Sequence, residues 1–160
     1  MNYLIRKIKA EDNAAVTTII RTVMAAFDCI GEGYSSSDPE VDAMSEYYRP
    51  PRSAYYVVEV DAVVLGCAGI APLEGGDRNT CELRKMYFLP ELRGAGIGHV
   101  LLQHCLAEAR AMGYKYCYLE TMEGMNAARK LYYRAGFRNL PQAKGDTGHG
   151  YCEVWMGMKL

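Results

Sequence analysis

The sequence predicts a mixed α/β fold in a single domain that spans residues 1–160, with about seven strands and about four helices. The length is that of one ordinary domain. In the first half, two β-rich runs are separated by only two residues, which indicates antiparallel strands. In the second half, strand-like and helix-like segments alternate, which is typical of strands joined by crossover helices. We therefore expect a twisted, mostly antiparallel mixed sheet with helices on both faces.

The first part of the chain predicts one strand and two helices. Polar and apolar residues alternate over residues 3–8, and a helix over residues 11–27 follows, with Asp12 as its candidate cap. A loop rich in Gly and Ser leads to a short second helix over residues 39–48, which Pro50 ends. The apolar residues at helical spacing in the first helix are Ala15, Ile19, Ile20, Val23 and Phe27.

The middle of the chain predicts a hairpin and a third strand. Residues 55–60 and 63–70 are rich in β-branched and aromatic residues, and Asp61 and Ala62 between them leave room only for a tight turn. After a turn over residues 73–79, residues 81–89 form another strand, which ends at Pro90.

The remaining segments predict two helices and three strands. Residues 97–112 have an apolar face, and Gly113 follows them where a left-handed residue is common. Residues 125–135 form a second helix, which Gly136 ends in the same way. The expected strands are residues 114–119, 137–140 and 151–158.

Composition excludes several classes of protein. Half of the residues are hydrophobic and 23% are charged, which excludes a disordered chain. No apolar run reaches the roughly 18 residues of a membrane span, and the charged N-terminal segment does not resemble a secretory signal. With a pI near 6.3 the chain lacks the excess of positive charge that nucleic-acid binding requires. We therefore expect a cytoplasmic protein that binds neither membranes nor nucleic acids.

The six cysteines predict neither disulfides nor a metal site. They form no C-x-x-C pair, and none has a histidine at ligand spacing. Most of them lie within apolar runs, so we expect buried free thiols in a reducing compartment and no bound metal.

The two halves of the chain carry opposite charge. Residues 1–80 contain 7 Lys or Arg and 12 Asp or Glu, whereas residues 81–160 contain 11 and 7, so the formal charges are −5 and +4. This division is consistent with an anionic ligand at the second half and a cationic one at the first.

Three glycines lie between the strand over residues 81–89 and the helix that begins near Ile97. Glycines at such a turn allow the backbone to approach a ligand, and the first N–H groups of the helix then face that ligand as a phosphate cradle. A dinucleotide fingerprint would need its third glycine one residue later, and a phosphate-binding P-loop would need Lys-Ser or Lys-Thr where His99 and Val100 stand. The residues of this loop are Arg93, Gly94, Ala95, Gly96, Ile97 and Gly98.

The loop matches the coenzyme A-binding pattern R/Q-x-x-G-x-G/A through Arg93, Gly96 and Gly98. Residues 82–90, which end in a hydrophobic-x-Pro step, and residues 125–137, with Leu-Tyr-x-x-x-Gly-Phe, match further motifs of the same family. Together with the order of the elements over nearly the whole chain, these motifs resemble the GNAT superfamily of N-acetyltransferases. The resemblance implies acetyl transfer from acetyl-CoA to a primary amine of a small molecule or peptide, without a covalent enzyme intermediate.

The resemblance also implies roles for single residues. The loop would hold the pyrophosphate of coenzyme A, and the main chain of Met86, Tyr87 and Phe88 would pair with its pantetheine arm between two splayed strands. One backbone N–H there would polarise the thioester carbonyl. Tyr132 matches the general acid that protonates the departing thiolate. Many members have Asn where Met125 stands, and here Asn126 is the neighbouring candidate for cofactor binding.

The general base is less well defined. Glu82 occupies roughly the position of a glutamate base in some members of the family, Glu120 and His149 are alternatives, and an ordered water is a further one. Near the acceptor site, tyrosines could form the wall of an amine pocket and arginines could bind a carboxylate, or both could have structural roles. These residues are Tyr34, Tyr47, Tyr48, Arg49, Arg52 and Arg78.

Two other functions are compatible with the sequence. The chain could be a non-catalytic module that binds acyl-CoA, or a nicotinamide-binding domain, for which Glu120 lies about 20 residues after the loop. Its short length and its glycine spacing disfavour the nicotinamide-binding domain. Pairing through the C-terminal strands would suit a homodimer.

Overall fold

The computed structural model describes residues 1–160 and contains seven strands and four α-helices. The strands are β1 (Leu4–Lys7), β2 (Ala54–Val60), β3 (Val63–Pro72), β4 (Thr80–Phe88), β5 (Tyr116–Thr121), β6 (Arg138–Asn139) and β7 (Val154–Lys159). The α-helices are α1 (Asn13–Ala26), α2 (Met44–Tyr47), α3 (Ile97–Ala111) and α4 (Asn126–Ala135). Short 3₁₀ turns cover Ala10–Asp12, Ser35–Ser37, Pro39–Asp42 and Pro90–Leu92.

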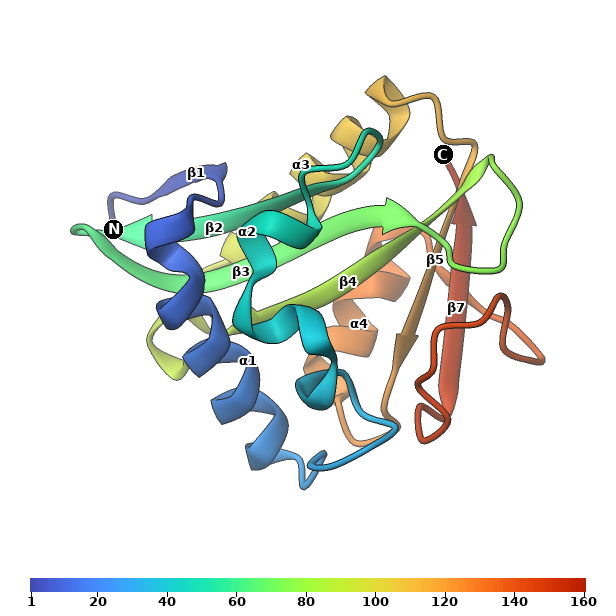
Figure 1. The fold of residues 1–160 in the computed structure, drawn as a ribbon, viewed down its shortest axis with the longest axis horizontal. Helices are drawn as coiled ribbons and strands as arrows, with labels where there is room; N and C mark the ends of the chain where they lie inside the picture. Colours follow the sequence, from blue (N-terminus) through green and yellow to red (C-terminus); the bar gives the residue numbers. More distant parts are fainter.

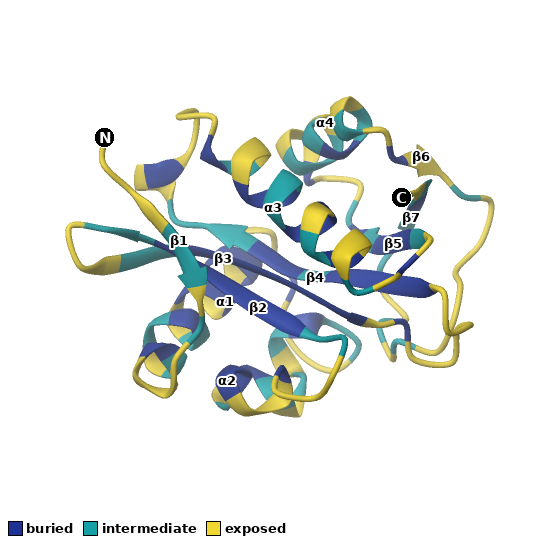
Figure 2. Ribbon diagram, turned by 90° about the horizontal axis from the view of Figure 1, so that it is seen from above, coloured by how far each residue is buried: buried dark blue, intermediate teal, exposed yellow.

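All strands belong to one sheet, in the order β1-β2-β3-β4-β5-β7-β6. Every neighbouring pair is antiparallel except β4 and β5, which are parallel. Helices α1 and α2 cover one face of the sheet, and α3 and α4 cover the other (Figures 1 and 2). This architecture confirms the predicted mixed, mostly antiparallel sheet with helices on both faces.

Each helical layer buries its own apolar core against the sheet. On one face, Val16, Ile19 and Ile20 of α1 are at most 1% exposed, and on the other Leu101 and Leu102 of α3 are fully buried. Burial of such a side chain contributes roughly 1.5–3 kcal/mol, so the spacing of these residues largely determines where α1 and α3 pack. None of the helices has both the length and the apolar composition needed to span a membrane.

The turn between β2 and β3 is formed by two residues with positive φ, Asp61 at 49° and Ala62 at 63°. Two successive positive φ angles are the geometry of a type I′ turn, whose twist matches that of antiparallel strands. Gly113 and Gly136 also have positive φ, at 86° and 113°. Gly136 directly follows α4, and Gly113 follows the C-cap residue Met112 of α3, so each glycine ends its helix as expected.

Three details of the N-terminal part differ from the sequence-based predictions. Asp12 does not cap α1 with its side chain, because its carboxylate accepts hydrogen bonds from Arg6 at 2.7 Å and from the Lys9 N–H at 2.7 Å. Phe27 is 41% exposed, since α1 ends one residue before it. The helix predicted over residues 39–48 is divided into a 3₁₀ turn and α2, because the non-helical backbone of Ala43, with φ −145° and ψ 43°, interrupts it.

The six cysteines are free thiols, as predicted, and all except the half-buried Cys152 are buried.

Strands β4 and β5 diverge soon after they begin. They pair only over Thr80–Glu82 and Tyr116–Tyr118, and the rest of β4 separates from β5 (Figure 1). A bulge at Lys85, whose φ is 48°, bends β4 where its register with β3 shifts between Cys67 and Gly69. The result is a V-shaped opening in the middle of the sheet.

Candidate active site

A cavity of about 330 Å³ lies in the opening between β4 and β5. Its lining includes Leu131 and Tyr132 of α4 on one face of the sheet and Val23 and Met24 of α1 on the other. Because α1 and α4 cover opposite faces (Figure 2), the cavity passes through the sheet between the two strands. A ligand that enters beside α3 and α4 can therefore meet a second ligand that enters beside α1.

The glycine loop forms one end of this cavity. Gly94 and Gly96 line it and have positive φ, 78° and 76°, and an added Cβ at either residue would have no neighbouring atom within 4 Å. Gly96 is the N-cap residue of α3, a helix of 15 residues whose first N–H groups are free to bind an anion. The loop thus leaves open space above backbone donors, which suits the pyrophosphate of coenzyme A.

The other residues of the loop have different positions. The Arg93 Nε donates to the Phe88 carbonyl at 3.2 Å, which places its guanidinium beside the cavity. Gly98 lines the cavity, and a Cβ there would lie 3.4 Å from Leu131 of α4, which is an ordinary van der Waals contact. Ile97 is only 2% exposed and belongs to the core, and neither it nor Ala95 lines the cavity with its side chain.

The edge of β4 that faces the opening has no partner strand beyond Glu82. Met86, Tyr87 and Phe88 line the cavity along this edge, and the Tyr87 hydroxyl is held 3.0 Å from the Ser35 hydroxyl. Unpaired strand edges accept extended ligands through main-chain hydrogen bonds. The geometry fits the pantetheine arm that the sequence motifs imply.

Tyr132 lies on the opposite wall of the cavity. Its side chain is 6% exposed, and its ring packs edge-to-face against Phe137 with a centroid distance of 5.9 Å. Burial raises the pKa of the Tyr132 hydroxyl above its ordinary value, and this hydroxyl has no hydrogen-bond partner in the protein. Tyr132 is therefore a protonated donor that is available to a ligand.

Asn126 does not reach the cavity. It is the first residue of α4 and is exposed, whereas the preceding Met125 is 8% exposed and lines the cavity. The one-residue offset of Asn126 from the asparagine of the family motif therefore turns its side chain away from the predicted cofactor site.

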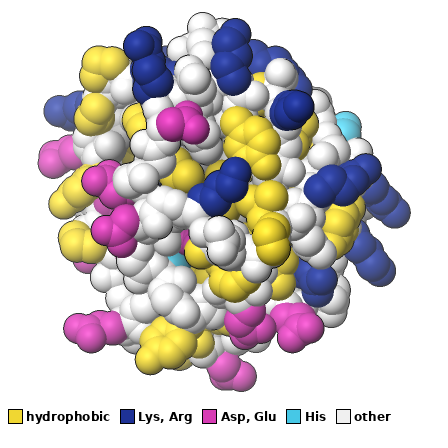
Figure 3. Space-filling model, turned by 90° about the vertical axis from the view of Figure 1, so that its right-hand side faces the viewer, with side chains coloured by type: hydrophobic (Ala, Val, Ile, Leu, Met, Phe, Trp, Pro, Cys, Tyr) yellow, Lys and Arg dark blue, Asp and Glu magenta, His cyan; other side chains and the backbone are white.

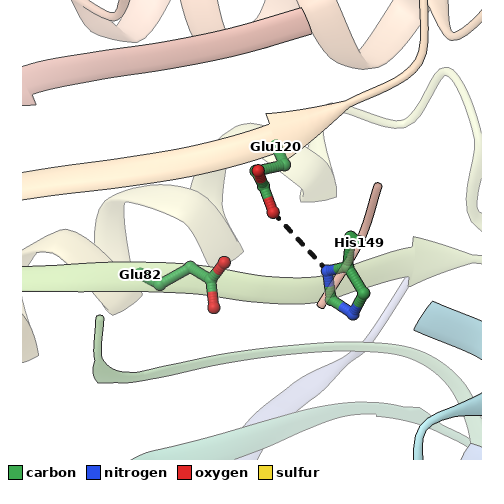
Figure 4. Close-up of side chains that lie close together, drawn as sticks. All are labelled: Glu82, Glu120 and His149. Carbon is green, nitrogen blue, oxygen red and sulfur yellow. Dashed lines mark ion pairs between the residues drawn. The ribbon is translucent and has the colours of Figure 1, made fainter. Parts of the chain in front are cut away.

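Three titratable side chains from distant parts of the chain meet at the end of the cavity beside α1. Figure 4 shows Glu82 of β4, Glu120 of β5 and His149 of the loop before β7 pointing toward one another. The His149 Nε2 lies 2.8 Å from Asp38 Oδ2, and its Nδ1 lies 3.6 Å from Glu120 Oε1. Glu82 is 4% exposed, and burial raises the pKa of its carboxyl group although Arg84 beside it opposes this.

The cluster of Glu82, Glu120 and His149 also has the donor atoms of a metal site, since one ligand atom from each lies within 4.8 Å of the others. Both ring nitrogens of His149 already face carboxylates, and Arg84 pairs with Glu82. Ion pairs within the protein are thus sufficient to account for this arrangement.

Lys85 forms a second buried set of ion pairs next to the cluster. Its side chain is 2% exposed, and its ammonium lies 2.6 Å from Asp38 and 2.5 Å from Glu40. Because a buried charge requires such partners, these contacts tie the loop before α2 to the bulge of β4. The sequence analysis did not single out Lys85, Asp38 or Glu40.

A second, polar cavity of about 240 Å³ lies beside the first. The two cavities share Glu82, Arg84, Lys85 and His149 in their linings. The two cavities therefore meet at these four residues.

The tyrosines and arginines expected near the acceptor site are only partly there. Tyr47 lines the second cavity, whereas Tyr48 packs on Tyr55 and Tyr34 stacks on Tyr151. No arginine of that set lines either cavity: Arg49 and Arg78 are exposed, and Arg52 lies 3.9 Å above the ring of Tyr114.

Side chains of opposite charge gather on different parts of the face shown in Figure 3. Lys and Arg lie mainly along its top and right, Asp and Glu mainly at its left and bottom, and a hydrophobic patch lies between them. This separation agrees with the opposite charges of the two halves of the sequence.

The ion pairs of His149 lead to a prediction about stability. Burial disfavours its charged form, but the hydrogen bond to Asp38 and the nearby carboxylate of Glu120 outweigh burial and raise the pKa of His149 to about 9. The charged imidazole therefore stabilises the fold fully below the unfolded pKa of about 6.5, and this contribution is lost as the pH rises through 9. The quantity to measure is the difference in free energy of unfolding between the wild type and His149→Gln. We expect this difference to be roughly 2–3 kcal/mol larger at pH 6 than at pH 10.

Denaturant titrations of both proteins across this pH range measure that difference. Since groups common to both proteins cancel, a difference that does not change with pH would contradict the pairing of His149.

The comparisons with known proteins agree with this geometry. The model of the Acetyltransferase (GNAT) family matches residues 20–137. The uncharacterized N-acetyltransferase YjgM of Escherichia coli is 42% identical over 158 residues, which are 98% of this chain and 95% of that protein. N-acetylaspartate synthetase of Homo sapiens is 33% identical over 99 residues, 62% of this chain and 32% of that protein.

A solved structure with the same fold is that of yncA from Salmonella typhimurium with its cofactor acetyl-CoA. Its TM-score is 0.78 at 24% identity, and the match covers 99% of this chain and 94% of that one.

Proposed function

Because this chain belongs to the acetyltransferase (GNAT) family of acyltransferases that use acetyl-CoA, we propose that it acetylates a primary amine of a small molecule or peptide by direct transfer. The observation that carries this proposal is the cavity through the sheet, which runs from the glycine loop to the cluster of Glu82, Glu120 and His149. One end suits a phosphate-bearing cofactor, and the other offers carboxylates to an ammonium group. We propose further that residues 1–160 act as one catalytic domain.

The cofactor would occupy the side of the cavity that faces α3 and α4. The N–H groups at the start of α3 bind the pyrophosphate, with Arg93 at the rim, and the free edge of β4 from Met86 to Phe88 holds the pantetheine arm. A backbone N–H near the bulge of β4 donates to the thioester oxygen, an interaction worth a few kcal/mol in comparable sites. Bound acetyl-CoA supplies a thioester carbon that an amine can attack.

The proton acceptor and the proton donor of the reaction lie on opposite walls of the cavity. Glu82, whose raised pKa makes it a stronger base than an exposed glutamate, accepts a proton from the acceptor ammonium directly or through one water. As the new N–C bond forms and the C–S bond breaks, the Tyr132 hydroxyl gives its proton to the departing sulfur. The acylated nitrogen then loses its extra proton, which returns to the Tyr132 oxygen through water. A thiol has an ordinary pKa of about 8.5, so the raised pKa of Tyr132 favours a strong hydrogen bond over early release of the proton.

Replacing Glu82 by glutamine is expected to lower kcat about tenfold. General bases commonly contribute 100-fold or more, but Glu120 and His149 lie close enough to take part of the role. Steady-state release of coenzyme A thiol measures the effect. A matched control is Glu108→Gln, because the Glu108 carboxylate on α3 accepts a hydrogen bond from the Tyr56 hydroxyl of β2 and lines neither cavity. Equal rates for the two variants would assign deprotonation to water.

The alternative is a non-catalytic module that binds acyl-CoA without turnover. The experiment that decides between the two is a thiol-release screen of acetyl-CoA with amino acids, polyamines, aminoglycosides and peptides. Acetyl-dependent release with any one amine supports the enzyme, whereas tight coenzyme A binding without turnover across the whole panel supports the module.

Amino acids form a second class of acceptor to include in this screen. The human relative is by name an N-acetylaspartate synthetase, although the shared segment covers only 32% of that protein. The screen should therefore contain aspartate, whose α-amine lies beside two carboxylates, together with amines that carry no carboxylate.

A further inference from the structure

The polar cavity beside the cluster provides the space for the acceptor. It shares Glu82 and His149 with the cofactor cavity, so an amine at the junction can place the rest of its atoms in this second space of about 240 Å³. Tyr47 of α2, Glu74 of the turn before β4, and Asp146 and Thr147 of the loop before β7 lie in its wall. The charges of this wall decide which acceptors it accommodates.

Every cation in the wall already has a carboxylate partner. Arg84 Nε lies 2.5 Å from Glu82, the Lys85 ammonium lies between Asp38 and Glu40, and His149 bonds Asp38. Lys144, the lysine of the loop that carries Asp146, lies 4.6 Å above the ring of Tyr116. A carboxylate or phosphate on the acceptor would therefore find no free cation here.

Two carboxylates in the wall have no cationic partner. Glu74 and Asp146 are exposed, and neither side chain forms a hydrogen bond or an ion pair. Their backbones are joined by a hydrogen bond of 2.7 Å from the Asp146 N–H to the Glu74 carbonyl, which keeps the two residues side by side at the rim. The wall as a whole contains five carboxylates, those of Asp38, Glu40, Glu74, Glu82 and Asp146, against the cations Arg84, Lys85 and His149.

We propose that the acceptor is an alkyl amine with a second positive charge, as in linear diamines and polyamines, an inference that rests on the proposed acetyl transfer. The reacting amine lies at the junction beside Glu82, and the second ammonium lies at the rim between Glu74 and Asp146. The polar cavity spans the distance between them. The same charges disfavour aspartate, because its carboxylates would face carboxylates of the wall.

Three probes of equal length test this inference on the full chain. They are 1,5-diaminopentane, 1-aminopentane and 5-aminopentanoate, which carry a positive, a neutral and a negative group at the far end. We expect kcat/KM for acetyl-CoA thiol release to fall about tenfold from the diamine to the monoamine, since each exposed carboxylate contributes roughly a factor of three to five. The amino acid should be poorer still, and added salt should reduce these differences.

The double variant Glu74→Gln with Asp146→Asn removes both charges of the rim and nearly preserves side-chain shape. The ratio of kcat/KM between diamine and monoamine is expected to fall from about ten toward one. The matched control is Asp61→Asn in the turn between β2 and β3, which removes one charge outside both cavities, and asparagine tolerates its positive φ. This control should leave the ratio unchanged.

The outcomes separate this inference from the proposed function. If 1-aminopentane, 5-aminopentanoate or aspartate equals or exceeds the diamine, or if the double variant keeps the ratio, the diamine inference is overturned while acetyl transfer stands. If no amine releases thiol and coenzyme A does not bind, acetyl transfer itself is wrong, and the inference fails with it.

Discussion

Replacing Gly96 by leucine is expected to weaken acetyl-CoA binding at least about 100-fold while the chain remains folded. Gly96 has a φ of 76° and caps α3, and an added Cβ would point into the open space where the phosphates are expected. A leucine side chain there blocks access to several backbone N–H groups at once, and hydrogen bonds to a charged ligand contribute roughly 1.5–3 kcal/mol each. The variant should also lose about 1–2 kcal/mol of stability, because leucine is strained at positive φ.

The other end of the same helix offers a matched control. Gly113 has a φ of 86°, an added Cβ would likewise meet no atom within 4 Å, and the residue does not line the cavity. Gly113→Leu should therefore show the same loss of stability and normal binding.

Isothermal titration with coenzyme A and thermal unfolding of both glycine variants provide the test. Normal affinity in Gly96→Leu would remove the phosphate site from this loop. Equal loss of affinity in both variants would instead attribute the effect to the general strain of a side chain at positive φ.

The architecture could be predicted from the sequence because its signals are local. The turn at Asp61 and Ala62 leaves only two residues between β2 and β3, and the periodic apolar residues of α3 specify its buried face without reference to distant residues. The coenzyme A loop is likewise one continuous segment, so its place at the strand-to-helix turn before α3 follows from its own glycines.

The acceptor side of the site could not be predicted in the same way. His149 and Asp38 are 111 residues apart in the chain, and their contact depends on how two irregular loops fold over the sheet. Neither loop has a periodic pattern, so nothing in the sequence indicated that His149 would lie half-buried between carboxylates. Lys85 is adjacent to Arg84 in an expected strand, and only the bulge reveals that it turns toward Asp38.

Asn126 illustrates a further limit of motif matching. In the sequence it is one residue from the expected position, but on a helix one residue corresponds to a rotation of about 100°, which is enough to move a side chain from the cavity to the surface. Met125 is buried and lines the cavity, whereas the next residue, Asn126, is exposed on the surface.

The opposite charges of the two halves of the chain correspond to different parts of the site. The polar cavity, where we propose that the acceptor binds, takes most of its carboxylates from the acidic half. Three of its five carboxylates, Asp38, Glu40 and Glu74, come from the acidic first half of the chain. The loop and α3, where we propose that coenzyme A binds, come from the basic second half. The proposed coenzyme A site and the proposed diamine site therefore follow one arrangement, in which each ligand would bind to the half of the chain that carries the opposite charge.

Replacing Tyr132 by phenylalanine is expected to lower kcat about 100-fold with little change in KM for acetyl-CoA. The ring keeps its edge-to-face contact with Phe137, so packing is preserved and only the hydroxyl is lost. Because that hydroxyl has no partner in the protein, its removal leaves no other buried group unsatisfied. The effect should appear in kcat, since the sulfur accepts a strong hydrogen bond only as negative charge develops on it.

The neighbouring tyrosine supplies the control for this experiment. Tyr133 is half-buried on the same helix and does not line the cavity, so Tyr133→Phe should retain normal kcat and KM. Initial rates of thiol release at saturating amine, measured over a range of acetyl-CoA concentrations, give both constants for each variant. If Tyr132→Phe raises KM and leaves kcat unchanged, the hydroxyl binds the cofactor in its ground state. If both constants stay normal, water protonates the thiolate and Tyr132 is only part of the cavity wall.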